Sequence, residues 1–378
     1  MLVAACLASL VMAGLVLGVG VNPAGALPFP SFRLPSFPFP SLPYPYFPAP
    51  ETLVVNCSGF NVQSGPSANL QSSINSAPAG STLLVSGVCY GNFTIGKSLT
   101  LQGSATLNGN GSGTVLTIST SGNVALNNLV IEAGSVGGIY VSSGAVTLDN
   151  STVAGNTSLT GGGVFNHSTM TITNSTVSNN LATVNGGGIY DAGNMTINDS
   201  FITYNNAATG GGIEDVAGSN LVVENSTVSH NNATQYSSTG NRGGGGIECN
   251  GSTQFINSTI SYNTTQWDGG GIFGFVTATG TTVSDNVAAV DGGGIYNLGP
   301  GLATYSNSSI TGNFANSNGG GIYNSPYGGT ELFLLSSSVT GNSANTGSLP
   351  GTNGGVANIP PAILVNFGSN ISGNSPGP

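Results

Sequence analysis

A glycine-rich unit that recurs about every 25 residues constrains the fold of this chain more than any other feature. Each unit has short hydrophobic runs and no helical pattern, and its period is too short for a propeller blade. The last glycines of the units are Gly138, Gly163, Gly188, Gly212, Gly246, Gly271, Gly294, Gly321 and Gly355, with spacings of 25, 25, 24, 34, 25, 23, 27 and 34 residues. We interpret the two long spacings as loops inserted at 234–242 and near 345–353. The period predicts an all-β fold in which each unit forms one coil of a parallel β-helix with three short strands.

Equivalent positions of the units predict columns of stacked side chains. Because neighbouring coils lie about 4.8 Å apart, a hydrophobic residue at the same place in every coil builds a continuous apolar column. The first column is Ile139, Val164, Ile189, Ile213, Ile247, Ile272, Ile295 and Ile322; the second is Val153, Val177, Ile202, Val228, Ile260, Val283, Ile310 and Val339. An asparagine follows the second column by three residues in every coil: Asn156, Asn180, Asn205, Asn231, Asn263, Asn286, Asn313, Asn342 and Asn374. Because Asn tolerates a left-handed backbone and hydrogen-bonds along a stack, we predict a turn ladder there.

The chain is almost uncharged. Its 378 residues include 3 basic and 13 acidic side chains, or 4 % charged residues in all. A nucleic-acid-binding protein needs Lys and Arg to neutralise phosphates, so this class is excluded. A stacked fold accounts for the scarcity, because like charges directly opposite one another on neighbouring strands repel.

The first fifty residues predict export rather than a folded domain. Residues 2–21 are an uninterrupted apolar run followed by Ala24-Gly25-Ala26, so we expect a signal peptide over 1–26, or an uncleaved membrane anchor there. Residues 27–50 are rich in Pro and predict a polyproline II linker. The β-helix domain then spans 51–378, with a cap at 51–100 and regular repeats at 130–375. We expect a secreted or cell-surface monomer that contacts a membrane only through the N-terminal segment.

A short helix is predicted at the start of the domain. Leu70 and Ile74 lie one helical turn apart after Ser67, a candidate N-cap, and Pro78 with Gly80 ends the pattern. Short alternating runs follow, separated by Gly, Asn and Ser turns, and they predict strands at 82–88, 93–95, 99–101, 115–118 and 124–131. This order of elements resembles the opening of right-handed parallel β-helix proteins, in which a short helix covers the first coil.

Two cysteines flank the predicted cap. In an exported protein the natural pairing of Cys57 with Cys89 is a disulfide that links the two sides of the cap. Cys249 is then left over, and we expect it to be a buried small side chain.

The repeat also carries a family resemblance. G-G-G-I-Y-N paired with S-x-x-x-x-N, as in 292–297 and 308–313, resembles the paired GGAI and FxxN repeats of chlamydial polymorphic outer-membrane proteins. More broadly, residues 60–375 resemble bacterial surface proteins of the right-handed β-helix, pectate-lyase-like superfold. The resemblance implies an adhesin-like role at the outer membrane or cell surface.

One row of the repeat contains most of the candidate chemistry. The residue directly after the first column is predicted to face outward, and the row reads Tyr140, Phe165, Tyr190, Glu214, Glu248, Phe273, Tyr296 and Tyr323. If the two glutamates lie in register, their strands are about 5 Å apart, so charge repulsion would raise the pKa of one of them. One carboxyl group could then act as the acid and the other as the base or nucleophile. We therefore name Glu214 and Glu248, with Arg242 on the inserted loop, as candidate catalytic residues.

Neighbouring positions supply candidate binding residues. Tyr190 and Phe273 flank the glutamates, and exposed aromatic rings stack on sugars. Asp191, Asp215 and Asp268 lie close by in the repeat pattern. Because hard cations prefer clustered oxygens, a Ca²⁺ ion could also bind among Asp191, Glu214, Asp215 and Glu248; no other cofactor is indicated.

Three functions stay open at this point. The first is a structural or adhesive module that binds polysaccharides, cell-surface glycans or another surface. The second is a polysaccharide lyase or glycoside hydrolase with Glu214 and Glu248 in a surface groove; against it, both could be solvated surface residues, with Arg242 neutralising one. The third is an ice-binding solenoid, because Thr-x-Ser steps repeat along an uncharged face: Thr152, Thr176, Thr227, Thr259 and Thr282.

Overall fold

A computed structural model describes residues 49–57, 68–234, 243–327, 329–345 and 354–376. The chain divides into two compact units, Met1–Tyr46 and Phe47–Pro378, and every described residue belongs to the second. The predicted signal peptide, most of the linker, Ser67 and both inserted loops lie outside the described residues. Within the described part, no helix is long and apolar enough to cross a membrane.

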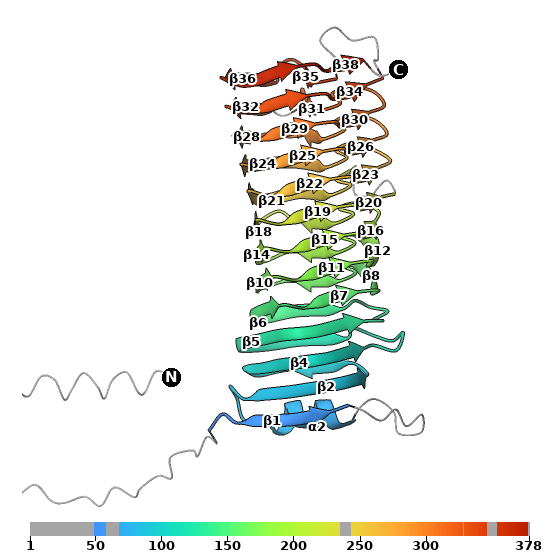
Figure 1. Ribbon diagram of the computed structural model, residues 1–378, viewed down its shortest axis with the longest axis vertical. Coiled ribbons are helices and arrows are strands. Elements are labelled where there is room, and N and C mark those ends of the chain that lie inside the picture. Colours follow the sequence, from blue (N-terminus) through green and yellow to red (C-terminus); the bar gives the residue numbers. More distant parts are fainter. Residues whose placement is uncertain (1–48, 58–67, 235–242, 328, 346–353, 377–378) are drawn as a thin grey trace, which may run out of the picture. The chain divides into compact units, whose positions relative to one another are not determined.

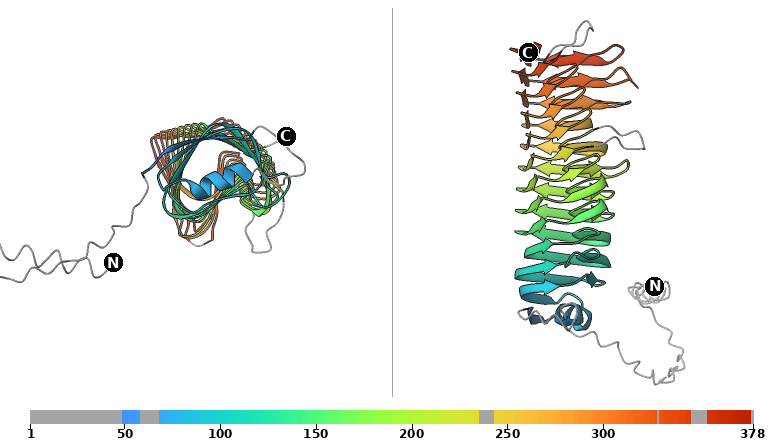
Figure 2. Two further views of the ribbon diagram at one scale, coloured as in Figure 1. Left: turned by 90° about the horizontal axis from the view of Figure 1, so that it is seen from below. Right: turned by 90° about the vertical axis from the view of Figure 1, so that its right-hand side faces the viewer.

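The described residues form a parallel β-solenoid, which confirms the predicted fold class (Figure 1). Strands of successive coils pair in parallel throughout, and the arrangement is consistent with a right-handed parallel β-helix. Seen along its axis, the successive coils lie over one another, and helix α2 lies across the N-terminal end of the solenoid (Figure 2).

The first coils differ from the rest because they include a helix and the longest strand of the described residues. They comprise β1 (Thr52–Asn56), α2 (Ala68–Ser76), β2 (Thr82–Tyr90), β3 (Phe93–Ile95), β4 (Leu99–Asn108) and β5 (Leu116–Glu132). The predicted helix is confirmed, and so are the predicted strands. The runs expected at 115–118 and 124–131 are joined into the single strand β5, and the sequence pattern did not reveal β1.

Helix α2 caps the core with the two residues that predicted it. Leu70 and Ile74 are fully buried. At its C-terminal end, the Lys97 ammonium donates to the backbone oxygens of Asn75 at 2.8 Å and Ala77 at 2.9 Å. A cation at this position satisfies carbonyl groups that the helix leaves unpaired.

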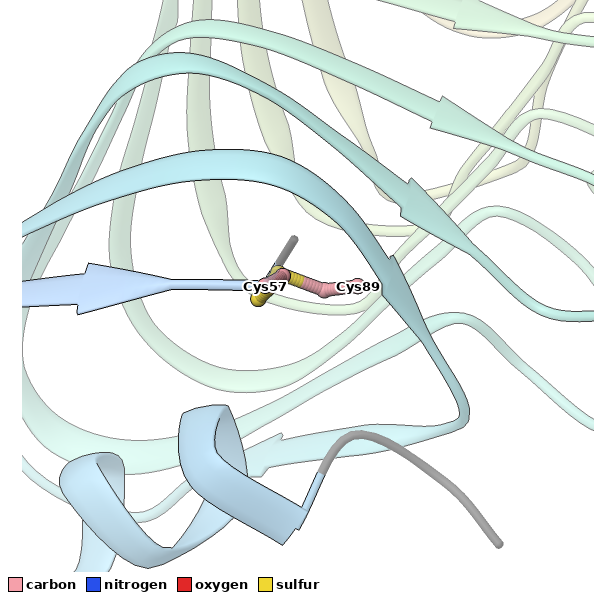
Figure 3. Close-up of a disulfide and its surroundings, with 2 residues drawn as sticks. All are labelled: Cys57 and Cys89. Atoms are coloured by element: carbon pink, nitrogen blue, oxygen red, sulfur yellow. A yellow bond between two sulfur atoms is a disulfide. The ribbon is translucent and has the colours of Figure 1, made fainter. Parts of the chain in front are cut away.

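The predicted disulfide between Cys57 and Cys89 is present beside α2 (Figure 3). It joins the segment after β1 to the end of β2. Cys249 is a free buried cysteine, as expected.

The regular coils repeat four short segments. The first segment forms β9 (Val164–Asn166), β13 (Ile189–Asp191), β17 (Ile213–Asp215), β27 (Ile295–Asn297), β31 (Ile322–Asn324) and β35 (Val356–Asn358). The second forms β10 (Thr169–Thr173), β14 (Asn194–Asn198), β18 (Asn220–Glu224), β28 (Leu302–Ser306), β32 (Glu331–Leu335) and β36 (Ile363–Phe367). In three coils one strand spans both segments: β6 (Ile139–Asp149), β21 (Ile247–Ile256) and β24 (Ile272–Thr279).

The other two segments lie on either side of the asparagine row. The third forms β7 (Thr152–Ala154), β11 (Thr176–Ser178), β15 (Phe201–Thr203), β19 (Thr227–Ser229), β22 (Thr259–Ser261), β25 (Thr282–Ser284), β29 (Ser309–Thr311), β33 (Ser338–Thr340) and β37 (Asn370–Ser372). The fourth forms β8 (Thr157–Thr160), β12 (Leu181–Asn185), β16 (Asn206–Ala207), β20 (Asn232–Ala233), β23 (Thr264–Thr265), β26 (Val287–Ala288), β30 (Phe314–Ala315), β34 (Ser343–Ala344) and β38 (Ser375–Pro376). The fourth segments make a separate nine-stranded sheet.

Both predicted apolar columns are confirmed. Ile189, for example, pairs with Val164 on one side and Ile213 on the other, and Val177 pairs with Val153 and Ile202. The members of both columns are buried within one continuous hydrophobic core.

The asparagine ladder is confirmed in its hydrogen bonding but not in its backbone conformation. Each amide donates from Nδ2 to Oδ1 of the Asn in the next coil; Asn205 to Asn231 is 3.0 Å. The left-handed residue is the one before the ladder Asn: Tyr204 has φ 56° and His230 has φ 56°. The ladder amides instead fill the inside of the corner. There Oδ1 of Asn231 also accepts from the backbone N–H of Asn205, the ladder Asn of the preceding coil.

Two glycines of each triplet are required for different physical reasons. Gly244 has φ 71°, which favours glycine. Gly246 packs so closely that a Cβ there would lie 2.7 Å from the Gly271 oxygen and 2.9 Å from Nδ2 of Asn263. The repeated glycines therefore turn the chain and also make room for the ladder.

Candidate functional site

The row that follows the first column lies on the outer side of its strands. Its members pair in register along the solenoid: Tyr140, Phe165, Tyr190, Glu214, Glu248, Phe273, Tyr296 and Tyr323. Phe165 and Tyr190 contact each other with tilted rings, 4.8 Å between centroids, whereas Phe273 and Tyr296 stack at 5.2 Å. Two groups of aromatic rings are thus separated by two glutamates.

Glu214 and Glu248 lie directly opposite each other in this row and their carboxyl groups are in hydrogen-bonding contact. Thr209 Oγ1 donates to Oε2 of Glu214 at 3.2 Å, and Asn250 Nδ2 donates to Oε1 of Glu248 at 3.2 Å. Oε2 of Glu248 is buried and has no hydrogen-bond partner among the described residues.

Burial controls the protonation of the pair. The exposed fractions of Glu214 and Glu248 are 1 % and 0 %. Burial, and then the charge of Glu248, raises the pKa of Glu214 well above its usual range. Burial raises the pKa of Glu248 to about 7. Near neutral pH the pair therefore retains a proton, as closely spaced carboxyl groups do.

This burial corrects both expectations for the glutamates, since they are neither in an open surface groove nor solvated surface residues. The turn before the strand covers them. A methyl group at Gly210 would lie 2.8 Å from Oε2 of Glu214, which shows how closely the turn packs on the carboxyl group. Alternation along the strand identified the outward side, but it could not show that another segment covers that side.

Asp191 and Asp215 face the opposite way, into the solenoid, and both are fully buried. Asn166 Nδ2 donates to Oδ1 of Asp191 at 2.7 Å, while the hydroxyl groups of Ser219 and Thr253 donate to Asp215. Burial raises the pKa of Asp191 to about 6 and also raises the pKa of Asp215. They form part of an internal polar row, so the prediction that they join the glutamates in one binding site is wrong.

The calcium hypothesis has no support in this geometry. Asp191 and Asp215 lie on the inner side of β13 and β17, whereas Glu214 and Glu248 lie on the outer side of β17 and β21. Within the described ranges, no group of three or more His, Cys, Asp or Glu side chains could hold a metal ion.

The remaining candidates lie apart from the glutamates or outside the described residues. Asp268 is near the C-terminal aromatic stack, where burial and then the Asp268 charge raise the pKa of Tyr296. Phe273 is 4 % exposed, so the prediction that its ring is open for stacking on a sugar is wrong. Tyr190 is half-buried against Phe165. Arg242 lies outside the described residues.

An open groove of about 380 Å³ lies at the N-terminal end of the row. Tyr140 of β6 and Phe165 of β9 form one wall, and Leu159 of β8, which is 68 % exposed, belongs to the other. His167 packs on Phe165 with ring centroids 4.6 Å apart. The lining residues are all uncharged: Thr114, Val136, Ile139, Tyr140, Ser158, Leu159, Thr160, Gly161 and Phe165.

This groove has only a partial signal in the sequence. Tyr140 and Phe165 belong to the outward row, but Leu159 stands at a position without a repeated residue type, and nothing in the period shows that β8 faces β6 across a groove. A second hollow of about 410 Å³, over Ser98, Asn123 and Thr147, has no aromatic wall.

The Thr-x-Ser steps lie in register on the third segments, β7, β11, β19, β22 and β25. Phe201 interrupts them, and its ring is 55 % exposed. Ice binding stays a prediction for this face.

The similarity of this chain to known proteins is low. No family model and no curated protein matches the chain, so the resemblance to chlamydial repeats stays a prediction. Among solved structures, an alginate lyase from Paenibacillus sp. str. FPU-7 is 16 % identical, with a TM-score of 0.46 over 68 % of this chain and 94 % of that chain. Pectate lyase Pel9A is 13 % identical, with a TM-score of 0.48 over 86 % of this chain and 80 % of that chain. Both neighbours are β-helix folds.

Proposed function

We propose that this protein is an exported β-helix module that binds a glycan in the groove between Tyr140, Phe165 and Leu159. The observation that carries the proposal is an open, uncharged groove with an aromatic wall and hydroxyl groups around it. Ligand sites are typically concave and apolar, with a few polar groups that fix orientation.

The chemistry of the lining favours a sugar. The C–H groups of a pyranose ring pack against aromatic and aliphatic side chains such as Tyr140 and Leu159, while its hydroxyl groups need hydrogen-bonding partners. Thr160 brings a hydroxyl that can donate and accept, whereas the Thr114 and Ser158 hydroxyl groups donate to the Val136 oxygen and offer their oxygens as acceptors. The lack of charge in the lining favours a neutral glycan over an anionic one.

Two observations support a secreted or cell-surface location. The Cys57–Cys89 disulfide is typical of proteins in oxidising compartments. The apolar run at 2–21 and the following small residues are typical of a signal peptide.

Replacing Tyr140 tests the groove. We expect Tyr140→Ala to weaken glycan binding at least tenfold, because it removes the ring against which the sugar packs; this corresponds to about 1.4 kcal/mol. Binding is measured on a glycan array and then by calorimetry with the best oligosaccharide. Tyr327→Ala, an exposed tyrosine outside the groove, is the control and should bind as wild type does. The proposal is contradicted if the wild type binds no glycan on the array, or if Tyr140→Ala binds the best oligosaccharide with the affinity of the wild type.

A second candidate function is polysaccharide cleavage at Glu214 and Glu248. The observation that favours it is the in-register pair of buried carboxyl groups, because carboxyl groups with separated pKa values can act as acid and base. Cleavage requires the turn at Thr209 and Gly210 to move away from the pair. If this candidate is correct, Glu214→Gln and Glu248→Gln each abolish the release of reducing ends or unsaturated sugars from a polysaccharide panel. A wild type that is inactive on the whole panel rejects it.

A further inference from the structure

Five consecutive coils carry a side chain at a corner where other coils carry glycine. The five residues, which we call the corner ladder, are Asn179, Tyr204, His230, Tyr262 and Asp285, with φ between 54° and 56°. The flanking coils have Gly155, Gly312, Gly341 and Gly373 at the same place. Glycine adopts this left-handed conformation freely, whereas a bulky side chain makes it unfavourable. Two tyrosines and a histidine at this corner therefore indicate a role that glycine cannot fill.

The three rings of the corner ladder form an exposed stack. His230 lies between Tyr204 and Tyr262, with ring centroids 4.8 Å and 5.1 Å away and interplanar angles of 24° and 22°. Tyr204 is 56 % exposed and Tyr262 is 54 % exposed, and His230 is also exposed. The aromatic rings of the outward row are buried or half-buried, but more than half of each tyrosine in this stack faces water.

We propose that the corner ladder binds an extended, uncharged polysaccharide chain that runs parallel to the solenoid axis. The ring spacing equals the separation of the coils, which is close to the advance per sugar of an extended glycan. Tyr hydroxyl and His imidazole groups alternate with apolar ring surface along the stack, so one side of each sugar meets carbon while its hydroxyl groups meet polar atoms.

The ends of the corner ladder fit the same class of ligand. Asn179 and Asp285 are exposed, one at each end of the ring stack, and both hydrogen-bond readily to hydroxyl groups. The corner ladder has no Lys or Arg, and Asp285 repels anions, so phosphate-rich or uronate-rich polymers do not suit it. The corner ladder shares no residue with the groove at Tyr140, so the two sites can be tested independently.

The test replaces two rings with the residue that neighbouring coils use. We expect the double substitution Tyr204→Gly and Tyr262→Gly to keep the folded structure, because Gly155 and Gly312 occupy the same corner. Retention of the full chain is measured by co-sedimentation with insoluble cellulose, chitin and β-1,3-glucan. Wild type should bind at least one of them, and the double variant should bind it at least tenfold more weakly with an unchanged or higher melting temperature.

Two control variants separate this site from others. Phe201→Thr removes an exposed ring on the neighbouring row, where other coils carry Thr, and should leave retention unchanged. Tyr327→Ala, an exposed tyrosine that belongs to neither site, should also leave retention unchanged, whereas a loss of retention in Tyr140→Ala alone would place the binding in the groove and overturn the proposal. The proposal is overturned if wild type binds none of the three neutral polymers. It is also overturned if wild type prefers chitosan or polygalacturonate, or if the double variant binds as wild type does.

Discussion

Asn231→Ala is expected to destabilise the solenoid by about 3–5 kcal/mol, because it leaves several buried polar groups without partners. The Asn231 amide makes four buried hydrogen bonds: it accepts from the backbone N–H of Asn205 at 2.9 Å and from Nδ2 of Asn205 at 3.0 Å, and it donates to the Ile202 oxygen at 2.9 Å and to Oδ1 of Asn263 at 3.0 Å. Each buried polar group left without a partner costs about 1–3 kcal/mol. Glycine backbone packs directly against this amide, since a Cβ at Gly212 would lie 2.8 Å from Nδ2 of Asn231.

Asn232→Ala is the matched control. This neighbouring Asn is half-buried and accepts one exposed hydrogen bond from Thr264 Oγ1 at 2.8 Å, so we expect a loss below about 1 kcal/mol. Urea unfolding followed by circular dichroism measures both variants. Equal midpoints for the two would show that the ladder amides contribute no more than exposed ones.

The second large effect is a loss of stability as the pH rises. The folded pKa of Glu248 is about 7, above its ordinary value of 4.5, so the folded state binds more protons than the unfolded state between these values. Stability is therefore greatest below pH 4.5 for this group and falls as the pH rises to about 7. The shift corresponds to about 3 kcal/mol. Asp191, with a pKa raised to about 6, acts in the same direction.

Glu248→Gln should remove most of this pH dependence. The introduced amide has no charge to bury and can donate to Glu214, so we expect the variant to be more stable than wild type at pH 8 by about 2–3 kcal/mol and similar to it near pH 4.5. The measurement is a series of urea unfolding curves across this pH range. Glu224→Gln, at a half-buried position on β18, should keep the wild-type pH dependence. A wild-type stability that rises between pH 5 and pH 8 would contradict the assignment.

The fold was predictable because the sequence repeats at two periods, every second residue along a strand and about every 25 residues from coil to coil. Alternation along a strand places Ile189 inside and Tyr190 outside, and the repeat of the unit places Ile189 beside Ile213 in the next coil. The cap was predictable for a similar reason, since Leu70 and Ile74 show a helical spacing that the repeats lack.

The site was only partly predictable, because burial on the outer side depends on contacts between different segments of a coil. The in-register pairing of Glu214 and Glu248 follows from the period, but the turn that covers them has no pattern of its own. The left-handed corner was assigned one residue too late, although Gly155 and Gly312 before the ladder Asn are a visible signal for it. When the coils are aligned on the residue before the ladder Asn, Tyr204 and Tyr262 are bulky residues at a position where other coils have glycine.

The ladders also determine which changes of length the protein tolerates. Every Asn amide meets an identical acceptor in the next coil, so removing or duplicating one complete unit brings equivalent residues together and preserves every hydrogen bond of the ladder. A deletion of one or two residues within a strand shifts the inward and outward positions and disrupts several rows at once. Gene rearrangements that add or lose whole units are therefore a structurally permitted way to lengthen or shorten this molecule, and they would move a ligand site along the axis in steps of about 4.8 Å.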